Sequence, residues 1–110
     1  MAMMTTEMKQ CVDTCRECHG VCLEMLSRHC LEQGGEHVAA EHVRRMLDCV
    51  QICQASADFM TRGSQLHQSV CRACSEICRA CAESCEKVGG MDECVSICRK
   101  CSESCGQMAA

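Results

Sequence analysis

The stretch that decides the fold is CRACSEICRACAESC, residues 71–85. Its cysteines recur in alternating steps of three and four residues, at positions 71, 74, 78, 81 and 85. Residues with this spacing share one side of an α-helix, and in a helical bundle that side normally carries Leu, Ile and Val. Here it carries thiols, which bind soft metal ions once they are deprotonated. The stretch therefore predicts a helix whose inward face binds metal.

Glycine-containing pairs divide the chain into four segments. The pairs are Gly34-Gly35, Gly63-Ser64 and Gly89-Gly90. Glycine just past a helix is a common stop signal, so we predict helices at about 6–33, 36–62, 65–88 and 91–108. Connections this short make neighbouring helices antiparallel. We expect an all-α fold, an antiparallel up-down-up-down four-helix bundle with a cysteine-lined core, formed by one domain over residues 1–110.

The same spacing recurs on all four predicted helices, as a stripe of Cys, Met and His. The stripe runs through Met4, Met8, Cys11, Cys15, Cys18, Cys22, Met25 and His29, then His42, Met46, Cys49, Cys53, Ser56 and Met60, then His67, Cys71, Cys74, Cys78, Cys81, Cys85 and Val88, then Met91, Cys94, Cys98, Cys101, Cys105 and Met108. Cys30 alone is expected to lie off the stripe, on a flank with Leu23 and Leu26. A pattern repeated on four helices is far more specific than a single Cys-x-x-Cys.

Composition indicates a core made largely of sulfur. The 110 residues include 16 Cys and 9 Met but one Phe, and the net charge is −4. Buried thiols behave as small hydrophobes, and Met fills irregular gaps. A basic patch with interleaved aromatic residues, typical of nucleic-acid binding, is absent from the sequence. Residues 1–7 lack the features of a signal peptide, and no apolar run is long enough to span a membrane. We therefore expect a cytoplasmic protein with reduced thiols.

Pairs of cysteines four residues apart favour monovalent copper. Seven such pairs occur, at 11/15, 18/22, 49/53, 74/78, 81/85, 94/98 and 101/105. Neighbours at this spacing on a helix have Cβ atoms roughly 5–6 Å apart, so one ion can bridge two sulfurs. Cu(I) is soft and accepts two or three sulfur ligands, whereas Zn²⁺ prefers a tetrahedron of four. About one Cu(I) per thiolate would also keep a buried core near neutral. We predict many Cu(I) ions per chain.

Met and His gather at both ends of the predicted bundle. One end collects Met25, His29, His42, Met46 and Met91, and the other collects Met4, Met8, Met60, His67 and Met108. Thioether sulfur and neutral imidazole bind Cu(I) without adding negative charge, so they could pass an ion to the thiolates. Met is also ordinary bundle filler, and a His at a helix end is often only solvated. Of the two ends, the one with two histidines is favoured for copper uptake.

Other functions fit the sequence less well. Cys15-Arg16-Glu17-Cys18-His19 has the spelling of a c-type haem attachment motif, but both cysteines already belong to the stripe. Iron–sulfur proteins usually gather their cysteines in a compact loop, often closed by Cys-Pro, and this chain has no proline. A disulfide scaffold is opposed by the helical periodicity. No catalytic set of nucleophile and base is visible, so we expect no enzyme. A general thiolate buffer for Zn or Cd stays the main alternative.

Helical Cys-x-x-x-Cys pairs, glycine-punctuated hairpins and Met/His at the ends make the chain resemble the bacterial copper storage proteins, the Csp family. Without a leader it is most similar to the cytosolic branch. The resemblance implies storage of Cu(I) by core cysteines, and a homotetramer of bundles; delivery by a copper chaperone stays open. The metal ligands expected on these grounds are Cys11, Cys15, Cys18, Cys22, Cys30, Cys49, Cys53, Cys71, Cys74, Cys78, Cys81, Cys85, Cys94, Cys98, Cys101 and Cys105, with Met25, His29, His42, Met46, Met60, His67, Met91 and Met108 at the ends. The second helix departs from the pattern, with only Cys49 and Cys53 as thiols.

Overall fold

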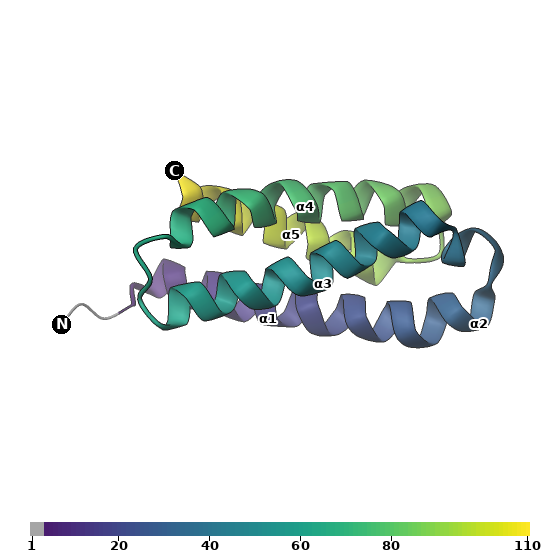
Figure 1. Ribbon diagram of the computed structural model, residues 1–110, viewed down its shortest axis with the longest axis horizontal. Helices are drawn as coiled ribbons and strands as arrows, with labels where there is room; N and C mark the ends of the chain where they lie inside the picture. The colour runs from purple at the N-terminus through teal and green to yellow at the C-terminus, as the bar shows by residue number, and fades with distance from the viewer. Residues whose placement is uncertain (1–3) are drawn as a thin grey trace.

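A computed structural model describes residues 4–110, and it is a bundle of four long helical rods. The first rod comprises α1 (Thr6–Glu24), the π-helical turn η1 (Met25–Cys30) and α2 (Leu31–Gln33). A 3₁₀ turn, η2 (Gly35–Val38), leads into α3 (Ala40–Thr61), which is followed by α4 (His67–Val88) and α5 (Asp92–Ala109). The rods lie along a molecule of 50 × 21 × 19 Å, with the start of α1 and the end of α5 at the same end (Figure 1).

The rods pack as an antiparallel ring, which confirms the predicted four-helix bundle. Helix α1 contacts α3 and α5, and α4 contacts the same two helices from the other side. Within residues 4–110, no helix combines the length and the apolar character that crossing a membrane requires. Residues 1–3, which belong to the segment considered as a leader, lie outside the described part of the chain.

Local chemistry explains where the helices begin and end. Thr5 caps the first helix, because its Oγ1 accepts a hydrogen bond of 3.1 Å from the Met8 amide. Gly89 follows the last residue of α4 with φ +84°, a conformation that a residue with a Cβ rarely adopts. Two predicted starts were a few residues early. The second rod begins with the η2 turn before α3, and a turn in which the Ser64 hydroxyl accepts from the Leu66 amide precedes α4.

The π-helical turn changes which residues of the first rod face the core. A π-helix closes hydrogen bonds over five residues instead of four, so one extra residue is accommodated without breaking the rod. Within this turn Leu26 and Cys30 are buried, while Met25 and His29 are only half-buried. The expected position of Cys30 on a flank is therefore wrong. Its side chain is 0% exposed and belongs to the core.

The core is built from sulfur, as the composition suggests. All 16 cysteines are fully buried, and Met46, Met60 and Met91 are the largest fully buried side chains. Ser56 and Ala57 on α3 and Ala82 on α4 fill narrower places between them. Close packing of small, polarizable groups takes the place of the branched aliphatic residues found in most bundles. The sulfur atoms therefore form one continuous column along the bundle axis.

Candidate metal centre

Four groups of four cysteines form the middle of the sulfur column. Within each group the four Sγ atoms all lie within 4.8 Å of one another, and every member is buried. The groups are Cys15/Cys74/Cys101/Cys105, Cys53/Cys74/Cys78/Cys101, Cys18/Cys49/Cys53/Cys78 and Cys18/Cys22/Cys49/Cys98. Each group draws its members from at least three of the helices α1, α3, α4 and α5. The inward stripes of the sequence thus converge into overlapping metal-sized clusters.

The sulfurs touch but are not bonded. The shortest Sγ–Sγ distances are 3.4 Å between Cys15 and Cys105, and 3.5 Å for the pairs Cys22–Cys98 and Cys53–Cys78. A disulfide needs about 2.03–2.05 Å, and all 16 thiols are free. These separations leave room for an ion between neighbouring sulfurs after small side-chain rotations.

Hydrogen bonding between thiols prepares some of them to lose a proton. Bonds with Cys81 and then Cys94 lower the pKa of the Cys85 thiol to about 4. In contrast, burial and then the nearby charge of Cys85 raise the pKa of Cys30, which lies outside the thiol network. A thiolate that accepts several hydrogen bonds is stabilised even in an apolar core. The column can therefore hold thiolates, which are the form that binds metal.

One end of the column carries mixed nitrogen and sulfur donors; we call it the His42 end. There Cys30 Sγ lies 3.8 Å from His42 Nε2 and 3.9 Å from Met91 Sδ, and Cys85 Sγ lies 3.4 Å from Met46 Sδ. Burial lowers the pKa of His42, which keeps the ring neutral. His42 Nδ1 lies 2.8 Å from Ser84 Oγ. When Nδ1 donates to this hydroxyl, Nε2 presents its lone pair to Cys30.

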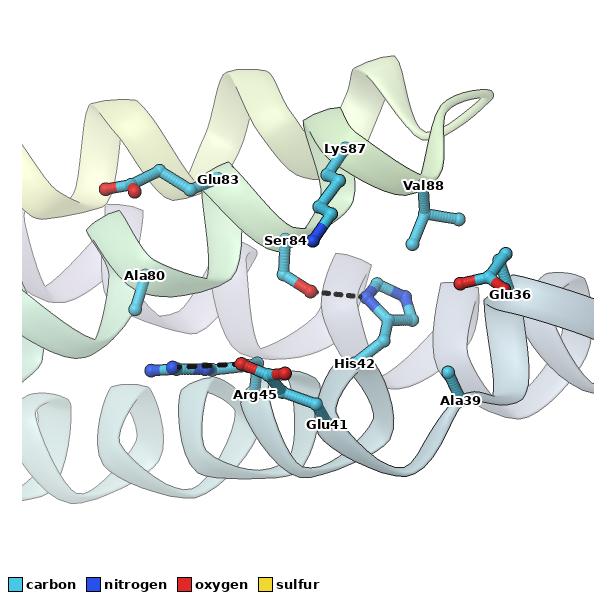
Figure 2. Close-up of a pocket in the computed structure, with 10 residues that line it drawn as sticks. All are labelled: Glu36, Ala39, Glu41, His42, Arg45, Ala80, Glu83, Ser84, Lys87 and Val88. Atoms are coloured by element: carbon cyan, nitrogen blue, oxygen red, sulfur yellow. Dashed lines mark hydrogen bonds and ion pairs between the residues drawn. The ribbon is translucent and has the colours of Figure 1, made fainter.

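A cavity of about 470 Å³ lies beside the His42 end. Figure 2 shows His42 between α3 and α4 with its ring turned to Ser84. The carboxylates of Glu36, Glu41 and Glu83 line this cavity together with the cationic side chains of Arg45 and Lys87. His42 is 3% exposed, so it separates the cavity from Cys30 and the sulfur behind it.

The opposite end is closed by Met. Met60 is 1% exposed, and Met4, Met8 and Met108 are half-buried against the core. His67 does not point along the column, because its Nδ1 lies 2.9 Å from the Ser64 carbonyl oxygen at the start of α4. The two ends therefore differ: imidazole contacts a thiol at one of them, and thioethers cover the column at the other.

Some of the predicted metal ligands lie outside the four cysteine groups. Cys71 is fully buried but belongs to none of the four groups. Met25 packs at the edge of the core, and His29 pairs with His37, with ring centres 5.0 Å apart.

Sequence reasoning missed Ser84, which orients His42. Its neighbour Cys85 lies on the stripe, so the only available signal was a hydroxyl one position before a predicted ligand.

Known proteins are similar to this chain over nearly its whole length. A family model described as "Csp: Copper storage protein" matches residues 4–110. The Nmul_A1745 protein of Nitrosospira multiformis is 50% identical, with a TM-score of 0.92 and 94% of each chain covered. Cu(I)-bound copper storage protein BsCsp3 is 28% identical, with a TM-score of 0.88, 96% of this chain and 100% of that chain covered.

A second structure of this kind, apo-Csp3 from Bacillus subtilis, is 29% identical, with a TM-score of 0.84, 93% of this chain and 98% of that chain covered. A search of curated protein sequences gave no match. The matching family is one of storage proteins. With the match extending from residue 4 to the last residue, this chain belongs to the copper storage protein family.

Proposed function

We propose that this protein stores many Cu(I) ions per chain on the thiolates of its core. The observation that carries the proposal is the sharing of sulfur between the four-cysteine groups. Each of six cysteines belongs to two groups: Cys18, Cys49, Cys53, Cys74, Cys78 and Cys101. Shared thiolates can bridge neighbouring ions, and Cu(I), with its two or three sulfur ligands, suits a continuous chain of such bridges.

The same sharing argues against a buffer for Zn²⁺ or Cd²⁺. A tetrahedral divalent site needs four ligands of its own. Because of the shared members, no more than two of the four groups can be occupied together without a common ligand. Two such ions would leave half of the thiols unused. A divalent ion on every thiolate would instead leave a large buried positive charge, whereas Cu(I) replaces one proton with one positive charge.

The Cu(I)-bound relative BsCsp3, similar to this chain over its whole length, supports the choice of metal. The test is an anaerobic Cu(I) titration followed by mass spectrometry of the intact protein. We expect a plateau well above four ions per chain, and full displacement of Zn²⁺ when Cu(I) is added to the zinc-loaded protein. A plateau at two ions or fewer, or zinc that resists displacement, would contradict Cu(I) storage.

Copper is proposed to enter and leave at the His42 end. The contacts of Cys30 with His42 and Met91, and of Met46 with Cys85, support a path from imidazole and thioether to thiolate. The adjoining cavity is lined by three glutamates, Arg45 and Lys87, so three negative charges face two positive ones and the balance of −1 favours a cation.

The uptake path is tested by kinetics. His42→Gln with Met46→Leu should slow Cu(I) uptake while leaving the final capacity nearly unchanged. His67→Gln with Met60→Leu makes the matched change at the opposite end and should leave the rate alone. Equal rates in the two variants would argue against the His42 end.

Three further features complete the proposal. Storage takes place in the cytosol, where buried thiols stay reduced. The bundles assemble as a homotetramer, which a mass measurement in solution tests. Copper is exchanged with a copper chaperone, and transfer from a Cu(I)-loaded donor protein tests this.

A further inference from the structure

Two histidines near the His42 end have ring nitrogens that no protein group satisfies. His29 Nε2 and His37 Nε2 are buried atoms without a hydrogen-bond partner. Among the described residues 4–110, Ser56 Oγ is the remaining side-chain atom in this condition. Buried polar atoms are paired in most proteins, and an exception calls for an explanation such as a bound ion. Imidazole is the commonest protein ligand of transition metals.

The separation of the two rings fits a bent metal bridge. Their centres are 5.0 Å apart and their planes cross at 80°. An ion about 2.0–2.1 Å from Nε2 lies about 3.2 Å from the ring centre. Two rings on one ion would then have centres about 5 Å apart at a tetrahedral angle, and about 6.4 Å apart if they stood opposite each other. The observed spacing matches the tetrahedral case and leaves too little room for the linear arrangement of two-coordinate Cu(I).

Neither ring belongs to the four cysteine groups of the column. His29 lies in the π-helical turn η1 and is half-buried, whereas its neighbour Cys30 turns inward to His42. His37 lies in the 3₁₀ turn η2, in the connection between the first two rods. Around the two rings the chain carries glutamates at 32, 36 and 41 against Arg28, so the local charge is negative and favours a cation.

We propose that His29 and His37 form a site for one divalent cation of the Zn²⁺ type. The ion is held by the two Nε2 atoms, with water completing the tetrahedron, and it links η1 to η2. The site goes beyond Cu(I) storage, because it uses no thiolate and takes a different class of ion.

The test uses the full chain, first loaded with Cu(I) so that the core thiolates are occupied. Zn²⁺ is then titrated anaerobically by calorimetry, and the imidazole signals are followed by NMR. We expect one saturable Zn²⁺ per chain, with shifts at His29 and His37. His37→Gln should weaken this binding at least tenfold without changing the amount of copper. His67→Gln, which alters a half-buried imidazole at the far end, should bind Zn²⁺ as the parent protein does.

Co²⁺ in place of Zn²⁺ distinguishes imidazole from thiolate ligation. A Co²⁺ absorption spectrum typical of tetrahedral coordination, without sulfur-to-metal charge-transfer bands, supports the site. Charge-transfer bands, unchanged Zn²⁺ affinity in His37→Gln, or no binding to the loaded parent would overturn it. Because copper loading is measured first, a failure of Cu(I) storage would be seen separately.

Discussion

Replacing Cys49 with alanine should cost more copper than replacing any cysteine outside the four groups. Cys49 Sγ lies within 3.7–3.9 Å of five other sulfurs, and it belongs to two of the groups. Cys71 is equally buried but belongs to none. If about one Cu(I) pairs with each thiolate, Cys71→Ala should lower the plateau by at most about one ion. Cys49→Ala also breaks bridges in two groups, and should lower it by about two to three.

Matched burial makes the comparison between the two variants clean. Both side chains are 0% exposed, and each change removes a single sulfur atom. Both should therefore destabilise the apoprotein by a similar amount, about 1 kcal/mol, as expected for a group the size of one buried methylene. The assay is the Cu(I) plateau by intact-protein mass spectrometry, with thermal unfolding of both apoproteins as the control. Equal copper losses at equal stability would refute the idea that shared sulfurs organise the store.

Three other changes probe the column and its ends. Ser56→Cys replaces a buried hydroxyl without a partner by a thiol, so the free energy of unfolding should rise by about 1–2 kcal/mol in thermal unfolding. The Cu(I) titration should show about one more bound ion, and a loss of stability would contradict this reasoning. Deleting Ser27 should let the first rod continue as a regular α-helix with the thiol of Cys30 still inward, leaving copper capacity unchanged; a lower plateau would show that the π-helical turn is required. Met91→Ala should destabilise the apoprotein by about 2–5 kcal/mol in chemical unfolding, and the half-buried Met108→Ala by clearly less; equal effects would contradict the assigned packing.

The four-helix bundle could be predicted because the chain uses regular helical spacing almost throughout. The ladder from Cys71 to Cys85 keeps its phase over the whole of α4, so every one of its cysteines is buried as expected. Cys30 could not be placed in the same way. Helical periodicity assumes 3.6 residues per turn, and the π-helical turn at Met25–Cys30 moves the later residues to a different face. No residue in that turn signals the change.

The ends of the column were harder to predict than its middle. His42 and Met46 lie where the stripe places them, in contact with thiols. His29 was assigned to the same stripe, but the π-helical turn leaves it beside His37. The stripe also could not indicate Ser84 as the partner of His42, because the two residues are 42 positions apart in the sequence and lie on different helices. Contacts of this kind depend on how the rods are rotated against each other.

The spacing of the core sulfurs has a consequence for survival in oxygen. Cys15 and Cys105, the closest pair, have sulfurs 3.4 Å apart, so these atoms would have to approach each other by more than an ångström to form a disulfide. Close packing of the core resists that movement, and full burial keeps oxidants away from every thiol. Packing and burial thus protect the thiols of the folded chain from oxidation. A disulfide reagent should react with the empty, native bundle far more slowly than with the unfolded chain.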